Sequence, residues 1–191
     1  MFYTIEIYCV LSTSYIKLTQ MKTVTRQKNI PEGSIITQNF ETIHYGDTFK
    51  GRLITSETID NITTGIMSMP RWVNVLMSIR NLIVGIFGLK TGNARITAVN
   101  EQYNVGSRVG YFWVLDRNEN EIVLGENDKH LNFRASVFMD CENKYVYLNT
   151  VVFFNNWLGR LYFVPVKPFH IIIIRSVMKS FIRKKSIIRK S

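Results

Sequence analysis

The chain has 191 residues, of which 46% are hydrophobic and 13% are aromatic. This is enough for one domain with a sizeable core, and it excludes a disordered chain. The formal net charge is +10, and the excess lies at one end, because residues 143–191 contain basic residues and no acidic ones. Cys9 and Cys141 form no CxxC motif, and no histidine stands at zinc-finger spacing. We therefore expect a reducing, cytoplasmic location with neither a disulfide framework nor a structural metal.

The first 28 residues contain no pattern typical of a packed element. Residues 1–18 are apolar like a signal peptide, but they lack a basic start and a small-residue cleavage site and contain Glu6. We expect translation to begin at Met21 and residues 1–28 to be a poorly ordered or over-extended N-terminus. The domain then covers residues 29–182, and residues 183–191 form a basic tail. No apolar run approaches the about 20 residues that a membrane-spanning helix needs.

Residues 29–68 contain a candidate short strand, one expected strand and one predicted helix. A candidate short strand at 34–37 follows the turn at 31–33. Residues 45–53 form the first expected strand, since Phe49 and Leu53 lie on one side of it. Ser56 is the expected N-cap of a short helix, in which three isoleucines recur at helical steps: Ile59, Ile62 and Ile66.

The clearest predicted helix covers residues 70–88. Pro70 stands near its start, and Gly88 ends it. Its apolar residues recur every three or four positions, which is typical of an amphipathic helix: Trp72, Val75, Leu76, Ile79, Leu82, Ile83 and Ile86.

From residue 105 the apolar period changes from helical to two, which predicts strands. Four strands are expected, at 109–115, 122–124, 131–139 and 145–154, and short polar turns join them. Parallel neighbours would need long crossover connections, so these strands form an antiparallel meander.

The C-terminal segment predicts an amphipathic helix from Pro168 onward. Ile171, Ile174, Met178 and Phe181 recur on one side, and the opposite side is basic and polar. Pro168 suits a first helical position, whereas Pro165 should kink or break a helix that begins earlier. We therefore expect a bent or two-piece C-terminal helix.

The order of elements is one strand, two helices, an antiparallel meander and a long C-terminal helix. Strands that are segregated from helices define the α+β class. The economical packing is a curved antiparallel sheet wrapped around the C-terminal helix, with the two earlier helices inserted after the first strand. Such an arrangement leaves room for a cavity between the last helix and the sheet.

Three blocks of the sequence, RWVNVLMSIRN, LGENDKHLNFR and FNNWLGRLYFVPVKPFH, resemble the bacterial family of domain of unknown function 2867 (DUF2867) over about residues 40–182. Members look like stand-alone small proteins or C-terminal domains of NmrA-like, short-chain-dehydrogenase-type proteins, so the resemblance implies an NmrA-like functional partner. The family's order of elements looks like the helix-grip fold of START and Bet v 1-like proteins. By that analogy, the cavity would hold an apolar ligand or perform cyclase or hydrolase chemistry.

The resemblance does not carry dinucleotide binding to this chain. A Gly-rich strand-turn-helix fingerprint is absent from the sequence, because Gly85 and Gly88 lie within and after a predicted helix. We expect no cofactor.

Four polar residues are the candidates for catalysis: Asp128, His130, Arg160 and His170. Glu126, Asp128 and His130 could form an acid–base cluster or a weak metal site, or they could simply cap a hairpin loop. Arg160 could pair with one of these acids, and Asn155 and Asn156 could cap a helix. A nucleophile elbow, a P-loop and an HExxH motif are all absent from the sequence, so binding is favoured over a cyclase or hydratase reaction.

Six aromatic residues are candidates to line a ligand pocket or to fill the core: Trp72, Tyr111, Trp113, Phe133, Phe153 and Tyr162. Four cations at the C-terminal end could contact an anionic membrane surface: Lys179, Arg183, Lys184 and Lys185. The alternative is that these cations complement the helix dipole. They lack interleaved aromatic residues, so we do not expect nucleic acid as a partner.

Overall fold

The computed structural model describes residues 24–38, 40, 42–53, 57–68, 95–96, 102–110 and 112–188, the side chains of 95–96 and 186–188 excepted. Eight strands and two helices are described within these ranges: β1 (Thr25–Gln27), β2 (Tyr45–Arg52), α2 (Ile59–Met67), β3 (Arg95–Ile96), β4 (Arg108–Gly110), β5 (Phe112–Arg117), β6 (Glu121–Asn127), β7 (Leu131–Asp140), β8 (Tyr145–Phe154) and α4 (Trp157–Ile188). The predicted helix at 70–88 and the segment 1–23 lie outside the described residues.

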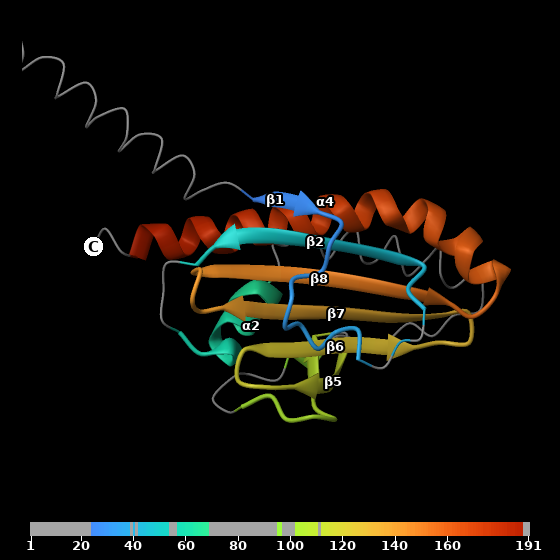
Figure 1. Ribbon diagram of the computed structural model, residues 1–191, viewed down its shortest axis with the longest axis horizontal. Coiled ribbons are helices and arrows are strands. Elements are labelled where there is room, and N and C mark those ends of the chain that lie inside the picture. The colour runs from blue at the N-terminus through green and yellow to red at the C-terminus, as the bar shows by residue number, and fades with distance from the viewer. Residues whose placement is uncertain are drawn as a thin grey trace, which may run out of the picture.

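All eight strands form one antiparallel sheet, in the order β1-β2-β8-β7-β6-β5-β4-β3 (Figure 1). After β2 the chain crosses to the far end of the sheet and returns strand by strand to β8. The last strand therefore lies beside β2, with Tyr45 opposite Val152 and Arg52 opposite Tyr145. The predicted α+β class, with an antiparallel meander and a long C-terminal helix, is confirmed.

The two helices cover one face of the sheet, which we call the inner face. Helix α4 packs on β2 and β8, and α2 packs on β6 and β7. Strand register places a row of buried side chains across four strands of this face: Phe49, Leu148, Val137 and Ile122. Ile62 of α2 and Met178 of α4 are fully buried in the same core. The apolar residues that recur with period two in the strands and at helical spacing in the helices therefore pack into one core.

The outer face of the sheet is partly covered by the segment before β2. Ile36 packs on Val123 and Val151, and the backbone N–H of Ile35 donates to the buried carboxylate of Glu121 at 2.6 Å. Residues 36–38 form a turn rather than the candidate strand at 34–37, because this segment bonds to a side chain below it instead of to a neighbouring strand.

The start of helix α2 differs from the sequence prediction. Thr58 is the N-cap, and its hydroxyl accepts a hydrogen bond from the N–H of Asn61 at 3.4 Å. Ser56 lies outside the described residues. The three isoleucines at helical spacing are all buried, as predicted.

The expected strand at 109–115 is two strands joined by a tight turn. Val109 of β4 lies opposite Phe112 of β5. Gly110 has a φ of 63°, a left-handed conformation that glycine adopts without a steric penalty. Alternation of apolar residues continues through this turn, which is why the pattern alone predicted a single strand.

Helix α4 is continuous from Trp157 to Ile188, so it is not two pieces and does not begin at Pro168. Pro165 and Pro168 both lie inside it, and both are exposed. Each proline removes one N–H and crowds the carbonyl four residues earlier. On the solvent side the freed carbonyls can bond water, and the helix can curve around the sheet instead of breaking. Figure 1 shows the resulting bend between the start of α4 and the long stretch beside β2.

One described helix is long and apolar enough to cross a membrane by length and composition alone: the stretch Trp157–Lys185 of α4. The sequence prediction of no such segment counted only uninterrupted apolar runs. Only 22% of the most apolar 18-residue window of this stretch is buried, although Val177, Met178, Phe181 and Ile182 pack on the sheet.

Candidate functional site at the seam between the sheet and the C-terminal helix

A buried carboxylate joins the sheet to the middle of α4. Asp47 is 0% exposed, and its Oδ2 accepts hydrogen bonds from the Tyr45 hydroxyl at 2.7 Å and from Arg26 Nε at 3.3 Å. Its Oδ1 lies 3.3 Å from Nε2 of His170. Arg26 also donates to the Tyr45 hydroxyl at 3.2 Å. Strands β1 and β2 and helix α4 thus contribute to one polar group, which we call the Asp47 cluster.

The electrostatics of the Asp47 cluster keep its acid ionised. Burial alone would raise the pKa of Asp47, but the hydrogen bonds from His170 and Tyr45 and the positive charge of Arg26 outweigh it and hold this pKa below its usual value. For Tyr45, burial, the hydrogen bond to Asp47 and the negative charge of Asp47 raise the pKa well above its ordinary value. The phenol therefore stays protonated and remains a donor.

The Asp47 cluster can offer hydrogen bonds and charge. A carboxylate that holds one nitrogen of a histidine is also a component of acid–base sites. Among the residues that the structure describes, no group of three His, Cys, Asp or Glu side chains could hold a metal ion. Cys141 is an exposed free thiol far along the chain from this cluster.

Aromatic side chains on the inner face form two groups. The rings of Phe112 and Phe133 are 5.3 Å apart. In the second group the rings of Phe154 and Phe163 are 5.4 Å apart, and the Tyr45 ring centroid lies 4.8 Å from that of Phe163, beside the Asp47 cluster. Phe112, Phe133 and Phe154 are only half-buried, and we call these three strand residues the aromatic wall.

The loop that contains His130 contacts the first turn of α4. Asn156 is the residue before the helix, and its Oδ1 accepts from the N–H of Gly159 at 3.1 Å. His130 Nδ1 lies 3.3 Å from the same oxygen, and Asn156 Nδ2 donates to Lys129 O at 3.0 Å. Asn155 Nδ2 donates to Asp128 O at 2.6 Å. The cap of α4 is therefore made by Asn156, and the loop is held by asparagine amides and main-chain carbonyl oxygens.

The other predicted catalytic residues do not come together. His170 contacts Asp47 and not Asp128, while His130 lies at the first turn of α4. Glu126 lies 3.9 Å from Arg108, and the guanidinium of Arg160 lies over the ring of Phe154 at 5.9 Å. Asp128 and the two histidines thus have different partners: Asp128 O accepts from Asn155, His130 contacts Asn156, and His170 contacts Asp47.

The predicted aromatic residues are divided between the two faces of the sheet. Phe133 lies on the inner face, and Tyr162 is buried beside Leu131. Phe153 lies on the outer face, where its ring is 4.8 Å from that of His44. Trp113 is 41% exposed, with the Arg108 guanidinium 4.5 Å from its ring. Trp72 and Tyr111 lie outside the described residues.

Asp47, Tyr45 and Arg26 were missed by sequence reasoning. A signal for Asp47 was present, because it stands two residues before Phe49 in a predicted strand and so belongs on the same buried side. An acid on the buried side of a strand must have a partner. Its partner His170 is 123 positions away, and no local pattern connects the two.

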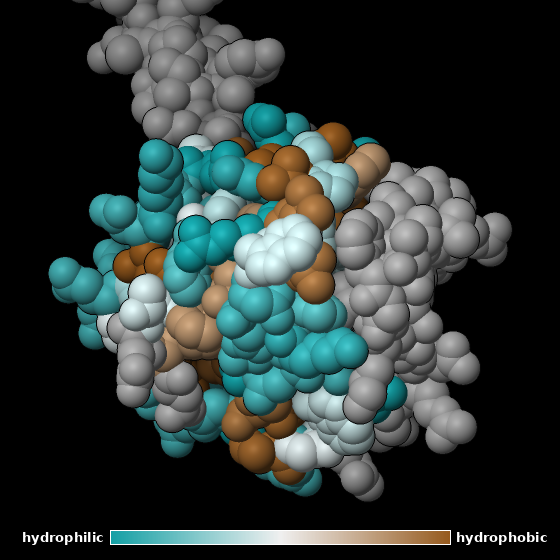
Figure 2. Space-filling view, turned by 90° about the vertical axis from the view of Figure 1, so that its right-hand side faces the viewer, coloured by the Kyte–Doolittle hydropathy of each residue, from teal (hydrophilic) through white to brown (hydrophobic). Residues whose placement is uncertain are grey.

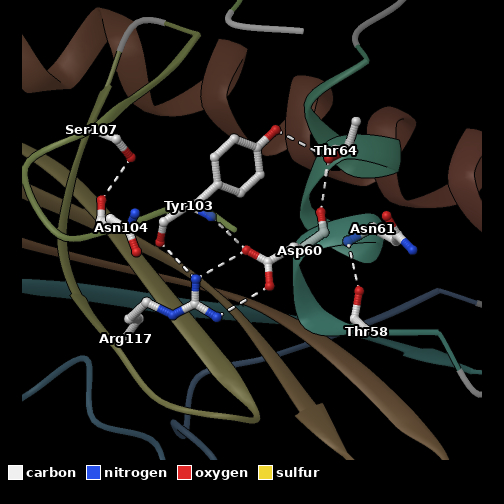
Figure 3. Close-up of polar contacts among 8 residues, drawn as sticks. All are labelled: Thr58, Asp60, Asn61, Thr64, Tyr103, Asn104, Ser107 and Arg117. Carbon is white, nitrogen blue, oxygen red and sulfur yellow. Dashed lines mark hydrogen bonds and ion pairs between the residues drawn. The ribbon is translucent and has the colours of Figure 1, made fainter. Parts of the chain in front are cut away.

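A second polar cluster has a structural role. Arg117 of β5 donates to both carboxylate oxygens of Asp60 in α2, at 3.0 and 3.1 Å, and to Tyr103 O at 2.7 Å. The N–H of Tyr103 donates to Asp60 at 2.8 Å. Figure 3 shows these side chains turned toward one another between the helix and the strand. The cluster holds α2 on the sheet, and its polar groups are satisfied by each other.

The cations of the C-terminal end are placed differently from one another. Lys179, Arg183 and Lys184 are exposed, whereas Lys185 forms an ion pair with Glu57. Lys185 therefore ties the end of α4 to the segment before α2.

The fold and the seam define a class: an α+β protein in which an antiparallel meander carries a long C-terminal helix across one face, with a buried polar cluster between them. The chain belongs to the DUF2867 family, described as a protein of unknown function, whose model matches residues 39–177. The resemblance of the three sequence blocks is thereby confirmed. No curated protein and no solved structure matches the chain.

Proposed function

We propose that the protein binds a small, mostly apolar molecule at the seam between the inner face of the sheet and α4. The observation that carries this proposal is the aromatic wall of Phe112, Phe133 and Phe154, which is half-buried in the interior-facing side of the sheet. Ligand sites are typically lined by aromatic and apolar side chains with a few polar groups that orient the ligand. The wall and the Asp47 cluster supply these two components.

The charges beside the cluster favour a ligand with an anionic end. The side chain of Arg26 is 41% exposed although its guanidinium bonds to Asp47, so it reaches the rim of the seam. Lys167 lies with its Nζ 5.1 Å from the Tyr45 ring. These two cations outnumber the one carboxylate. A carboxylate at one end of an apolar ligand would complement this charge and would find the guanidinium of Arg26 close by.

A fluorescent fatty-acid analogue and its methyl ester test both parts of the proposal by titration. Phe133→Ala removes part of the wall, and we expect the affinity for either probe to fall by about tenfold. Phe153→Ala is the matched control, because Phe153 is also a half-buried strand residue but lies on the outer face. The affinity of the Phe153→Ala variant for both probes should equal that of the wild-type protein.

The acid and ester probes also separate the anionic end from the apolar body. Arg26→Gln should reduce the preference for the acid over the ester, whereas Lys28→Gln, at an exposed position of similar charge, should preserve it. Cooperative thermal unfolding of each variant excludes probe uptake by a loosened core. No saturable binding to the wild-type protein, or equal loss in Phe133→Ala and Phe153→Ala, would contradict the proposal.

A further inference from the structure

The exposed side of α4 carries an ordered change from apolar to basic residues. Its members follow at steps of three or four residues and so share one helical face, which we call the outer stripe: Trp157, Leu161, Val164, Pro168, Ile172, Arg175, Lys179 and Arg183. All are exposed, and the stripe lies opposite the residues that pack on the sheet. Figure 1 shows that α4 runs along the length of the sheet, so the stripe is a long surface of the molecule.

The first half of the outer stripe is apolar to an unusual degree for a surface. Trp157 and Val164 are each 69% exposed, and Ile172 is 55% exposed. Phe169, 40% exposed, flanks them. Figure 2, which faces the end of the molecule where α4 begins, shows hydrophobic side chains at the surface beside hydrophilic ones. A contiguous apolar surface of this kind marks a site of interaction.

The second half of the outer stripe is cationic through Arg175 and Lys179. Both side chains are exposed and are four residues apart, one above the other on the same helical face. The whole of α4 contains no Asp or Glu. Lys185 forms an ion pair with Glu57 and is not part of the outer stripe.

We propose that the outer stripe docks on an anionic lipid surface, with α4 parallel to it. The apolar half would enter the boundary between headgroups and acyl chains, and the basic half would contact the anionic headgroups. Helices that lie in this boundary combine exposed aliphatic and aromatic residues with Lys and Arg. The site is independent of the proposed ligand seam, because it uses the opposite side of α4.

A second copy of the chain does not complement this surface. Two copies that meet by the stripe would be related by a two-fold axis. Antiparallel stripes would place each basic half on the other's apolar half and desolvate the cations without a partner. Parallel stripes would place the basic halves together. An anionic leaflet meets both halves at once, because it offers negative charge above an apolar layer.

A surface position also fits α4 better than a spanning one. Val177, Met178, Phe181 and Ile182 are buried against the sheet, and a spanning helix would have to leave this packing. Pro165 and Pro168 leave the carbonyls of Leu161 and Val164 without their helical donors. Water and headgroups at an interface can satisfy these carbonyls, whereas hydrocarbon cannot.

Co-sedimentation of the full chain with lipid vesicles tests the proposal. We expect binding to phosphatidylcholine vesicles that contain about 30% phosphatidylserine, weak binding to phosphatidylcholine alone, and weaker binding at about 0.5 M salt. Arg175→Glu with Lys179→Glu should lower the partition coefficient by at least about 30-fold. Lys28→Glu with Lys144→Glu makes the same change in net charge at exposed positions off α4, and it should have a much smaller effect.

The apolar half is tested by Val164→Asp, which should lower binding to the anionic vesicles by about tenfold. Val105→Asp is its control, since Val105 is 59% exposed in a loop before β4. Circular dichroism and the unfolding midpoint establish that each variant is folded. Equal binding to both kinds of vesicle, or binding that Val164→Asp leaves unchanged, overturns the proposal. Absence of vesicle binding together with capture by an acidic protein surface also overturns it.

Discussion

Nε2 of His170 lies 3.3 Å from Oδ1 of Asp47, and this contact joins the middle of α4 to β2. The two residues are 123 positions apart in the chain. Because Asp47 is fully buried, its ionised form depends on His170, Tyr45 and Arg26 for stabilisation. The position of α4 on the sheet is therefore linked to the protonation of one carboxyl group.

Asp47→Asn should change how the unfolding free energy depends on pH in the acidic range. The folded-state pKa of Asp47 lies below the unfolded value of about 3.9, so the unfolded chain binds more protons in this range. The contribution of Asp47 is therefore complete above about pH 4 and is lost as the pH falls through the folded pKa. Urea unfolding at several pH values measures it. We expect Asp47→Asn to cost about 2–4 kcal/mol at neutral pH and less at pH 3. A pH-independent loss would contradict the assignment.

Glu121 should affect the pH dependence of the unfolding free energy in the opposite direction to Asp47, and in a higher pH range. Its carboxyl is fully buried, and burial raises the pKa although Ser136, Ser34, the Ile35 N–H and Asn149 oppose it. With a folded pKa above the unfolded value of about 4.3, its stabilising contribution is complete below that value and is lost as the pH rises through the folded pKa.

Glu121→Gln provides the measurement for this second group. Gln resembles the protonated acid at every pH. Protonation of Glu121 makes the wild-type protein more stable as the pH falls toward about 4.3, and the variant should lack this increase in unfolding free energy. The difference in unfolding free energy between the two proteins is followed by urea titration. Glu126→Gln, at a partly exposed acid in the same strand, is the control and should leave the profile near that of the wild type. Parallel profiles for wild type and Glu121→Gln would refute the prediction.

Arg117→Lys should weaken the attachment of α2 to the sheet. Lysine keeps the charge but cannot donate to both oxygens of Asp60 and to Tyr103 O in the same fixed geometry. We expect a loss of about 1–3 kcal/mol in unfolding free energy, with hydrogen exchange of α2 increasing most. Arg175→Lys, at an exposed position of α4, should change stability by less than about 0.5 kcal/mol. Similar losses in both variants would argue against a role for the paired hydrogen bonds of the Arg117 guanidinium.

Gly159→Ala should be destabilising although alanine is the better helix former. A Cβ at this position would lie 2.1 Å from His130 O, so the loop at 128–130 or the start of α4 must move. Helix propensity alone predicts a gain of about 1 kcal/mol, whereas we expect a loss of several kcal/mol in thermal or urea unfolding. Gly46→Ala is the comparison, because its nearest new contacts are at 3.8 Å. A stabilised Gly159→Ala variant would show that this approach is not tight.

Local patterns determined much of the fold. Alternation in 131–139 indicated which side chains of β7 face the core, and Ile59, Ile62 and Ile66 indicated the buried side of α2. Period and burial are linked because a strand or helix with one apolar side can be stable only when that side is removed from water. The same patterns could not distinguish a turn at Gly110 from continued strand, since the deciding property is a backbone angle.

Tertiary structure decided what each buried side meets. The pairing of β2 with β8 brings Asp47 under α4, and only the path of the chain across the sheet determines that His170, rather than Asp128 or Arg160, belongs to the same site. It also decided that Pro165 and Pro168 face solvent, where they bend α4 instead of ending it. Periodicity specifies the direction of a side chain relative to its own element. The identity of its partner depends on contacts between distant parts of the chain, which no local window contains.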